Sequence, residues 1–170
     1  VTYTSPQLRS RLGIQQLPGG KGVFPDMTVR QNLVMGAYIH RSDGDDVARR
    51  ITSVLELFPD LERRQDQRAG SMSGGQQQML ALARVLLHEP EVLLIDELSL
   101  GLAPTVVHDL LELVERLQER GQTIILVEQS LNVALSIADR AIFLEKGQVR
   151  FEGSAQELLE RDDIDRKSVV

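Results

Sequence analysis

Ser73-Gly74-Gly75-Gln76 is a short stretch whose residue types could bind phosphate. Serine is a good helix N-cap, and a glutamine three residues later can reach back to the cap amide, which makes a capping box. The two glycines add no side chains, so the backbone N–H groups at this positive helix end are exposed to an anion, and a phosphate is the natural ligand. The alternative is a plainly capped helix whose glycines serve packing.

A second stretch, Glu91–Glu97 (EVLLIDE), ends in two adjacent carboxylates, Asp96 and Glu97. The apolar run does not alternate, which favours a parallel strand buried on both faces. In open α/β sheets ligands bind at the carboxyl ends of such strands. We therefore expect Asp96 to hold Mg²⁺ directly or through water, and Glu97 to orient or deprotonate an attacking water. The alternative is a strand end that is merely solvated by acids.

The elements that must position these groups form a strand–helix–strand unit. A second apolar run, Gln122–Gln129 (QTIILVEQ), indicates another buried parallel strand. Between the two runs, Pro104 begins a helix with apolar residues at helical spacing, and Gly121 ends it. A right-handed connection is strongly favoured for such a unit.

The rest of the chain adds helices and a hairpin, so the sequence predicts an α/β fold with an all-helical insert in its first half. Residues 5–26 are rich in Gly, Pro and Gln, and Leu17–Pro25 is typical of a loop. The other predicted elements are a helix from Thr28, a helix over Asp45–Phe58 that Pro59 ends, a helix over Leu131–Ala138, a hairpin over Ala141–Gly153 with Lys146-Gly147 at its turn, and a last helix over Ala155–Glu160.

Composition limits the classes of function. The 170 residues, 42% of them hydrophobic, fit one globular domain, and the lack of cysteine excludes disulfides and thiolate metal sites. A net charge of -6 argues against a nucleic-acid partner, and the basic pairs Arg49-Arg50 and Arg63-Arg64, interleaved with acids, indicate solvated helix faces or a partner contact. No apolar run approaches the roughly 20 residues of a membrane span, so a membrane role is expected to be peripheral. The three histidines, His40, His88 and His108, have no second ligand at metal spacing, and we expect surface or helix-end roles for them.

Several motifs together resemble the nucleotide-binding subunit of ATP-binding-cassette (ABC) transporters, most closely those of branched-chain amino acid importers. The resemblance covers roughly residues 8–160. Its motifs are MSGGQ (Met72–Gln76, the family signature), VLLIDE (Val92–Glu97, the acidic strand), SLGLAP (Ser99–Pro104, the following loop), VFPDMTVRQNLVMGAY (Val23–Tyr38, the start of the helical subdomain) and LVEQ (Leu126–Gln129, the switch position).

This resemblance implies a P-loop NTPase-like fold with a mostly parallel sheet and helices on both faces. It divides the chain into a helical subdomain at about residues 26–72, the signature helix and RecA-like core at about 73–160, and a charged tail at 161–170. Two such domains would close head to tail over two ATP molecules, with Ser73–Gln76 of each facing the γ-phosphate held by the other. The implied partners are a second ATPase subunit, identical or different, and permease subunits docked at the helical insert and the loop before it, which places the protein on the cytoplasmic face of the plasma membrane.

The resemblance also implies roles for single residues. Glu97 would be the catalytic base, Asp96 would hold Mg²⁺, and Gln129, where many relatives have His, would contact the γ-phosphate without taking a proton near neutral pH. Ser99 and Gly101 belong to the loop that follows the acidic strand. The leading interpretation is an ATP-hydrolysing importer subunit.

Two departures from the family pattern bear on function. The P-loop motif is absent, since Lys21 is followed by Gly22, and we expect the natural protein to carry that loop upstream of Val1. The resemblance places the P-loop strand at the centre of the sheet. We therefore expect residues 1–170 to lack this central strand and not to fold alone. Gly19 occupies the loop position where relatives have Gln or Glu, and it has no side chain to ligate Mg²⁺. A degenerate, non-catalytic half-site that completes a partner's site or regulates assembly is the alternative, and a small-molecule-binding α/β domain unrelated to transport is a third reading.

Overall fold

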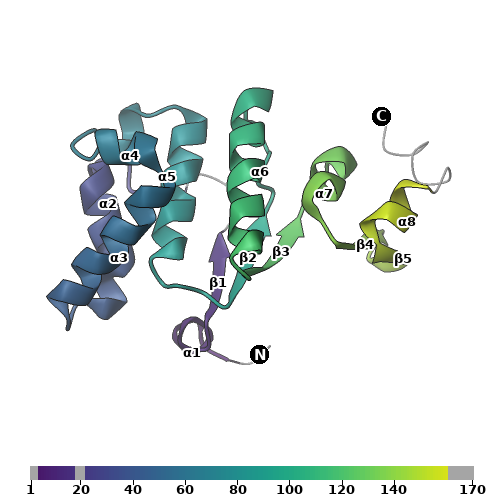
Figure 1. The fold of residues 1–170 in the computed structure, drawn as a ribbon, viewed down its shortest axis with the longest axis horizontal. Helices are drawn as coiled ribbons and strands as arrows, with labels where there is room; N and C mark the ends of the chain where they lie inside the picture. The colour runs from purple at the N-terminus through teal and green to yellow at the C-terminus, as the bar shows by residue number, and fades with distance from the viewer. Residues whose placement is uncertain (1–3, 18–21, 161–170) are drawn as a thin grey trace. The chain divides into compact units, whose positions relative to one another are not determined.

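The computed structural model describes residues 4–17 and 22–160, and the chain divides into two compact units, Val1–Val127 and Glu128–Val170 (Figure 1). Within the described ranges, no helix combines the length and the apolar character that a membrane span needs.

The first unit is built around a parallel three-stranded sheet in the order β1 (Ile14–Leu17), β2 (Val92–Asp96), β3 (Thr123–Val127). The central strand β2 buries Leu93 and Ile95. Helix α6 (Pro104–Glu119) connects β2 to β3, which confirms the predicted strand–helix–strand unit. In register, Asp96 pairs with Val127, so the acidic end of β2 lies at the carboxyl edge of the sheet.

Strand β3 differs from its prediction. Its residues alternate in exposure, and Ile125 and Val127 are more than half exposed, so the expectation of burial on both faces is wrong for this strand. The described elements of the first unit leave that face of β3 uncovered.

A short helix and a strand that the sequence analysis did not predict precede the Leu17–Pro25 loop. Ser5 caps α1 (Pro6–Arg11) by accepting a hydrogen bond from the N–H of Leu8 at 3.2 Å. Strand β1 follows, and its Leu17 is fully buried opposite Ile95. The residues 18–21 of the loop lie outside the described part of the chain.

The helical insert consists of α2 (Val29–Gly36), η1 (Ala37–His40), α3 (Gly44–Leu57), α4 (Pro59–Arg63) and η2 (Ala69–Ser71). Thr28 caps α2 through a capping box with Gln31, as its residue type favours. The buried Asn32 fixes the entry loop, because its Oδ1 accepts from the N–H of Phe24 at 2.8 Å and its Nδ2 donates to the carbonyls of Phe24 and Thr28, each at 3.0 Å. Helix α3 ends before Pro59, as predicted, but Pro59 also begins α4, which was not predicted.

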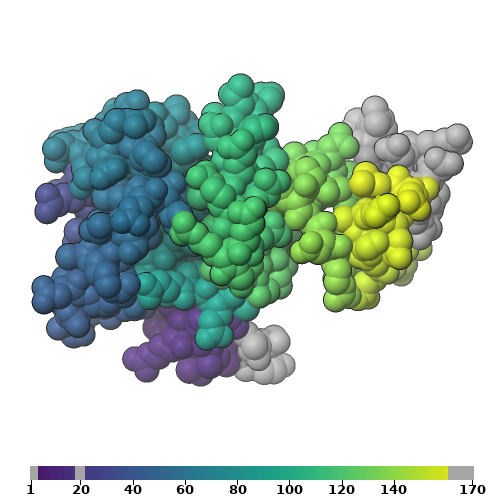
Figure 2. Space-filling model, in the orientation of Figure 1, coloured from purple at the N-terminus to yellow at the C-terminus, as the bar shows by residue number. Residues whose placement is uncertain are grey.

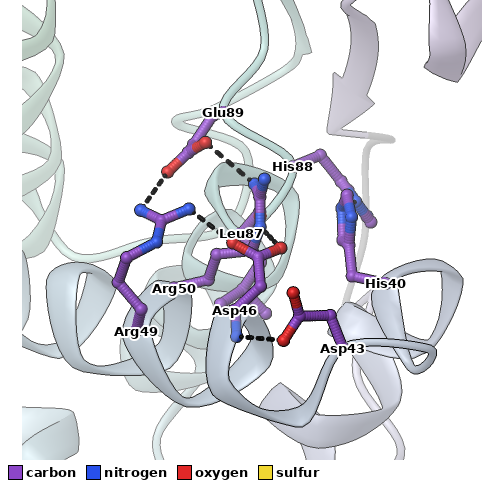
Figure 3. Close-up of polar contacts among 8 residues, drawn as sticks. All are labelled: His40, Asp43, Asp46, Arg49, Arg50, Leu87, His88 and Glu89. Atoms are coloured by element: carbon purple, nitrogen blue, oxygen red, sulfur yellow. Dashed lines mark hydrogen bonds and ion pairs between the residues drawn. The ribbon is translucent and has the colours of Figure 1, made fainter.

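Charged side chains join α3 to the C-terminal end of α5 (Gly74–Leu86), as Figure 3 shows. Arg50 donates to Asp46 at 2.7 Å and to the carbonyl of Leu87 at 2.9 Å, and it forms an ion pair with Glu89 at 3.0 Å. Arg49 pairs with the same two carboxylates. The side chain of Arg50 is only 13% exposed, so this basic residue joins two helices of the chain itself and is not part of a solvated face. The surface view shows the insert, in blue, beside α6, in green (Figure 2).

The second unit contains α7 (Leu131–Ile137), the antiparallel hairpin of β4 (Arg140–Glu145) and β5 (Gln148–Ser154), and α8 (Ala155–Leu159). Lys146 and Gly147 form the turn with φ of 51° and 76°, the positive values that a two-residue type I′ hairpin turn requires. Leu135, Ala155 and Leu158 form a small core, against which Phe143 and Phe151 pack. The predicted hairpin and its flanking helices are confirmed.

Candidate functional site

The N-terminus of α5 has the predicted capping box. Ser73 Oγ accepts from the N–H of Gln76 at 3.3 Å, and Gln76 Oε1 accepts from the N–H of Ser73 at 3.0 Å. Gly74 and Gly75 take the first two helical positions, whose N–H groups have no acceptor within a helix. Because α5 runs for 13 residues, its aligned peptide dipoles make this end a favourable place for an anion.

The two glycines at this end have different surroundings. Gly75 is buried, and a Cβ added there would overlap Cγ1 of Val106 on α6 and lie 3.0 Å from its Cγ2. Gly74 is exposed, and a Cβ there would meet only Leu102 Cδ2, at an ordinary 3.7 Å. The packing alternative therefore applies to Gly75, whereas nothing within the described chain requires a glycine at position 74.

The acidic pair lies where β2 ends. Asp96 is the last residue of the strand, and the N–H of Glu97 donates to the carbonyl of Val127 at 2.8 Å; both acids are half-buried. Glu97 has φ of 50°, a left-handed backbone conformation that is uncommon for a residue with a side chain. Such outliers persist where the surroundings over-determine them, and they concentrate at functional sites.

The loop after the acidic strand packs on the start of α5. Leu98 is fully buried. Gly101 has φ of 71° and open space around it, so glycine is needed there for the backbone conformation and not for packing. The N–H of Leu102 donates to the carbonyl of Ser99 at 3.2 Å, which tightens the loop. Through Leu102 and Val106, the structure brings the predicted loop together with the Ser73–Gln76 stretch.

The roles of all these site residues stay predictions, and two further residues complete the predicted set. Gln129 lies exposed near the start of the second unit, two residues after β3 ends. Gly19 lies outside the described residues.

Asp60 on α4 is a residue of this site that the sequence analysis missed. Its Oδ2 accepts from Gln76 Nε2 at 3.2 Å and from Arg64 Nε at 3.0 Å, and its Oδ1 accepts from Arg63 at 3.2 Å. Partial burial works against ionisation, but the hydrogen bonds from Arg64, Arg63 and Gln76 together hold the pKa of Asp60 below its usual value. The carboxylate thus fixes the side chain that completes the cap of α5. The spacing of Asp60 from Arg63 and Arg64 was the available signal.

The acidic end of β2 can be compared with the ligands that a metal ion needs. Among the described residues, no group of three or more His, Cys, Asp or Glu side chains is placed to hold a metal ion. A single half-buried carboxylate such as Asp96 fits Mg²⁺, which proteins bind through one or two carboxylates together with waters and substrate phosphates.

A groove in the helical insert is a second candidate site. Val47, Ala48, Ile51 and Leu55 of α3 line it together with Val34 of α2. Arg30, Glu56, Glu62 and Gln65 surround this apolar floor. Val34 is 48% exposed. An apolar floor with a charged rim is a surface that an amphipathic segment can fill.

Sequence comparison places the chain among known proteins. Residues 3–99 match the family model described as ABC transporter. The chain is 47% identical over 149 residues to a high-affinity branched-chain amino acid transport ATP-binding protein of Pseudomonas aeruginosa, covering 88% of this chain and 63% of that protein. It is 38% identical over 167 residues to a probable branched-chain amino acid transport ATP-binding protein of Archaeoglobus fulgidus, covering 98% of this chain and 70% of that protein.

Solved structures show the same fold. A nucleotide-free ATP-binding cassette from an ABC transporter matches with a TM-score of 0.81 at 22% identity, over 98% of this chain and 72% of the other. The cbiO1 protein of Clostridium perfringens, part of an ABC transporter complex, matches with a TM-score of 0.79 at 27% identity, over 95% of this chain and 64% of the other. The chain thus spans about two thirds of the length of the proteins it resembles.

Proposed function

The chain belongs to the ABC transporter family, and from that premise we propose that it acts in an ATP-hydrolysing subunit that powers an importer of branched-chain amino acids. The observation that carries the proposal is the capped start of α5, with an exposed glycine at its first position, packed beside the loop that follows the acidic end of β2. The names of the two relatives support the solute class.

The start of α5 is the proposed phosphate contact. Ser73, Gly74, Gly75 and Gln76 would face the γ-phosphate of an ATP held by a second ATPase subunit, so each site would be completed between two subunits. The amides at the first two helical positions, which have no acceptor within a helix, and the helix dipole favour an anion there. The link from Asp60 to Gln76 keeps the cap in place while that anion binds.

The acids at the end of β2 are the proposed catalytic groups. Glu97 would orient the attacking water and receive its proton as the water attacks the γ-phosphate in line, while the bond from the γ-phosphorus to the β–γ bridging oxygen breaks and ADP leaves with that oxygen. Asp96 would hold Mg²⁺ together with phosphate oxygens and waters, and the ion would neutralise charge on the phosphates. Gln129 would donate a hydrogen bond to the γ-phosphate, and as an amide it would take no proton.

The insert is the proposed contact with the membrane partner. An amphipathic segment of a permease would fill the groove lined by Val34, Val47, Ile51 and Leu55, with its charges at the rim of Arg30 and Glu62. The subunit would then lie on the cytoplasmic face of the plasma membrane, bound to its permease and to a second ATPase subunit. A nucleic acid is not a proposed partner, because the net charge is -6.

Replacement of Glu97 tests the proposal in the complete polypeptide assembled with its permease. Glu97→Gln keeps size and polarity but removes the base, so ATP turnover should fall to background, while ATP-bound dimers of the separate ATPase subunit persist in size-exclusion chromatography. Glu91→Gln is the matched control, because Glu91 is an exposed carboxylate immediately before the opposite end of the same strand. Turnover in the Glu97→Gln variant equal to that of the Glu91→Gln variant would remove Glu97 from the mechanism.

A further inference from the structure

We propose that Val106, on the first turn of α6, is a positioning residue that sets the place of the phosphate-facing amides at the start of α5. This inference rests on the proposed function, because it concerns the part of α5 that would meet the nucleotide. It adds a residue that does not itself touch nucleotide.

The contact between Val106 and Gly75 is too close for any other residue at position 75. An added Cβ would overlap one γ-carbon of Val106 and lie 3.0 Å from the other and 3.1 Å from its Cβ. Glycine within a helix is about 1 kcal/mol less favourable than alanine. The close approach of α6 explains why position 75 is glycine despite this cost, since the side chain of Val106 occupies the space that a Cβ would need.

The side chain of Val106 has little conformational freedom, and the helical turn that carries it is fixed. A β-branched side chain in a helix keeps essentially one χ1 rotamer, so its two methyl groups hold α5 at one distance. Pro104 begins α6, and the N–H of Val106 donates to the carbonyl of Ala103 at 2.9 Å, which fixes the first turn. Buried Leu98 anchors the other end of the loop directly after Glu97.

These contacts give one short path from the acidic pair to the start of α5. Val106 comes nine positions after Glu97 in the sequence, and the loop between them also contacts Gly74 through Leu102. In the proposed dimer the acids serve the nucleotide of their own subunit, whereas the start of α5 serves that of the second subunit. A change at Val106 should therefore impair hydrolysis in the dimer and leave nucleotide affinity of the separate subunit unchanged.

A size-swap experiment tests the positioning role in the complete polypeptide assembled with its permease. Gly75→Ala should lower kcat by about tenfold or more, because the new methyl pushes α5 away from α6. Val106→Ala in the same protein removes both γ-carbons and should recover at least about fivefold of that loss. Recovery should stay incomplete, because the remaining Cβ contact at 3.1 Å is still tight.

The single variants give the readout that separates positioning from general damage. Val106→Ala alone should lower kcat by about threefold or more, with the Kd of a fluorescent ATP analogue for the separate subunit unchanged. Val107→Ala is the matched control, since it removes the same atoms from the neighbouring half-buried position of α6 and leaves Gly75 in contact with Val106. It should keep the wild-type kcat.

Two results would overturn the inference. The first is a double variant that is no more active than Gly75→Ala, provided that the Gly75→Ala protein folds. The second is a Val106→Ala variant whose kcat equals that of Val107→Ala, and this result decides the question if the Gly75→Ala protein does not fold. Loss of the proposed function is distinguishable, because the wild-type protein would then hydrolyse no ATP. In that case the packing is tested by unfolding, where Val106→Ala must restore the stability that Gly75→Ala removes.

Discussion

The half-buried His88 should make the folded protein lose stability in mild acid. His88 follows α5, and its Nδ1 lies 3.3 Å from Nε2 of His40, which is the contact at the right of Figure 3. Burial lowers the pKa of His88 to about 4, and the charges of His40, Arg50 and Arg84 add to the effect. The perturbation is a change from neutral pH to about pH 5.

The sign and size of the change in the free energy of unfolding follow from the protonation of His88 in the folded and unfolded states. An unfolded chain protonates this imidazole near pH 6.5, whereas the folded chain resists protonation until about pH 4, so the unfolded state binds more protons between these values. The free energy of unfolding therefore falls as pH falls through that window. From about pH 7.5 to about pH 5, the full shift would remove about 2 kcal/mol. Solvent screening of a half-buried group reduces this to about 1 kcal/mol.

Urea unfolding of the complete polypeptide, followed by circular dichroism at both pH values, measures the effect. His88→Asn is the comparison, because the amide can replace Nδ1 in the contact with His40 but does not titrate. Titrating groups that do not contact residue 88 are common to both proteins, so their contributions cancel in the difference. The wild-type protein should lose about 1 kcal/mol more than the variant between the two pH values. Equal losses would refute the assignment of a lowered pKa to His88.

Two further predictions concern backbone strain and the entry to the insert. Glu97→Gly should raise the free energy of unfolding by about 1 kcal/mol in urea titrations, because glycine adopts the φ of 50° freely. The same variant should lose ATP turnover. A free energy of unfolding that is unchanged or lower would show that the backbone of Glu97 is not strained. Asn32→Ala should lower the free energy of unfolding by about 2–3 kcal/mol in the same assay, because it leaves the N–H of Phe24 and nearby carbonyls without their buried partner, and a loss below about 0.5 kcal/mol would contradict that account.

The elements that the sequence predicts well carry their own local signals. Ser73 and Gln76 define the start of α5 by residue type and spacing, and the structure has their reciprocal hydrogen bonds. Pro104 begins α6, and Gly121, with φ of 84°, follows its end. In each case the signal is a backbone requirement of the residue itself, so no distant contact was needed to find it.

The missed features depend on partners that lie far away in the sequence. Strand β1 has two glutamines among four residues and no pattern of its own; it is a strand because it pairs with β2. The contact of His88 with His40 joins residues 48 positions apart, so spacing could not reveal it. Helix α4 was hidden for another reason, since Pro59 both ends one helix and begins the next.

The pair of glycines shows how far a motif can be interpreted without a structure. The sequence leaves two interpretations for both glycines, an open backbone for a phosphate or packing. Gly75 is explained within the chain, because Val106 occupies the space of its side chain. Gly74 is not explained in this way, because its φ is not positive and an added Cβ would meet only an ordinary contact at 3.7 Å. Alanine at this position would also favour the helix by about 1 kcal/mol. A reason for glycine at position 74 must then come from outside the described chain, and the close approach of phosphate to its amide that we propose, brought by a second subunit, would supply one.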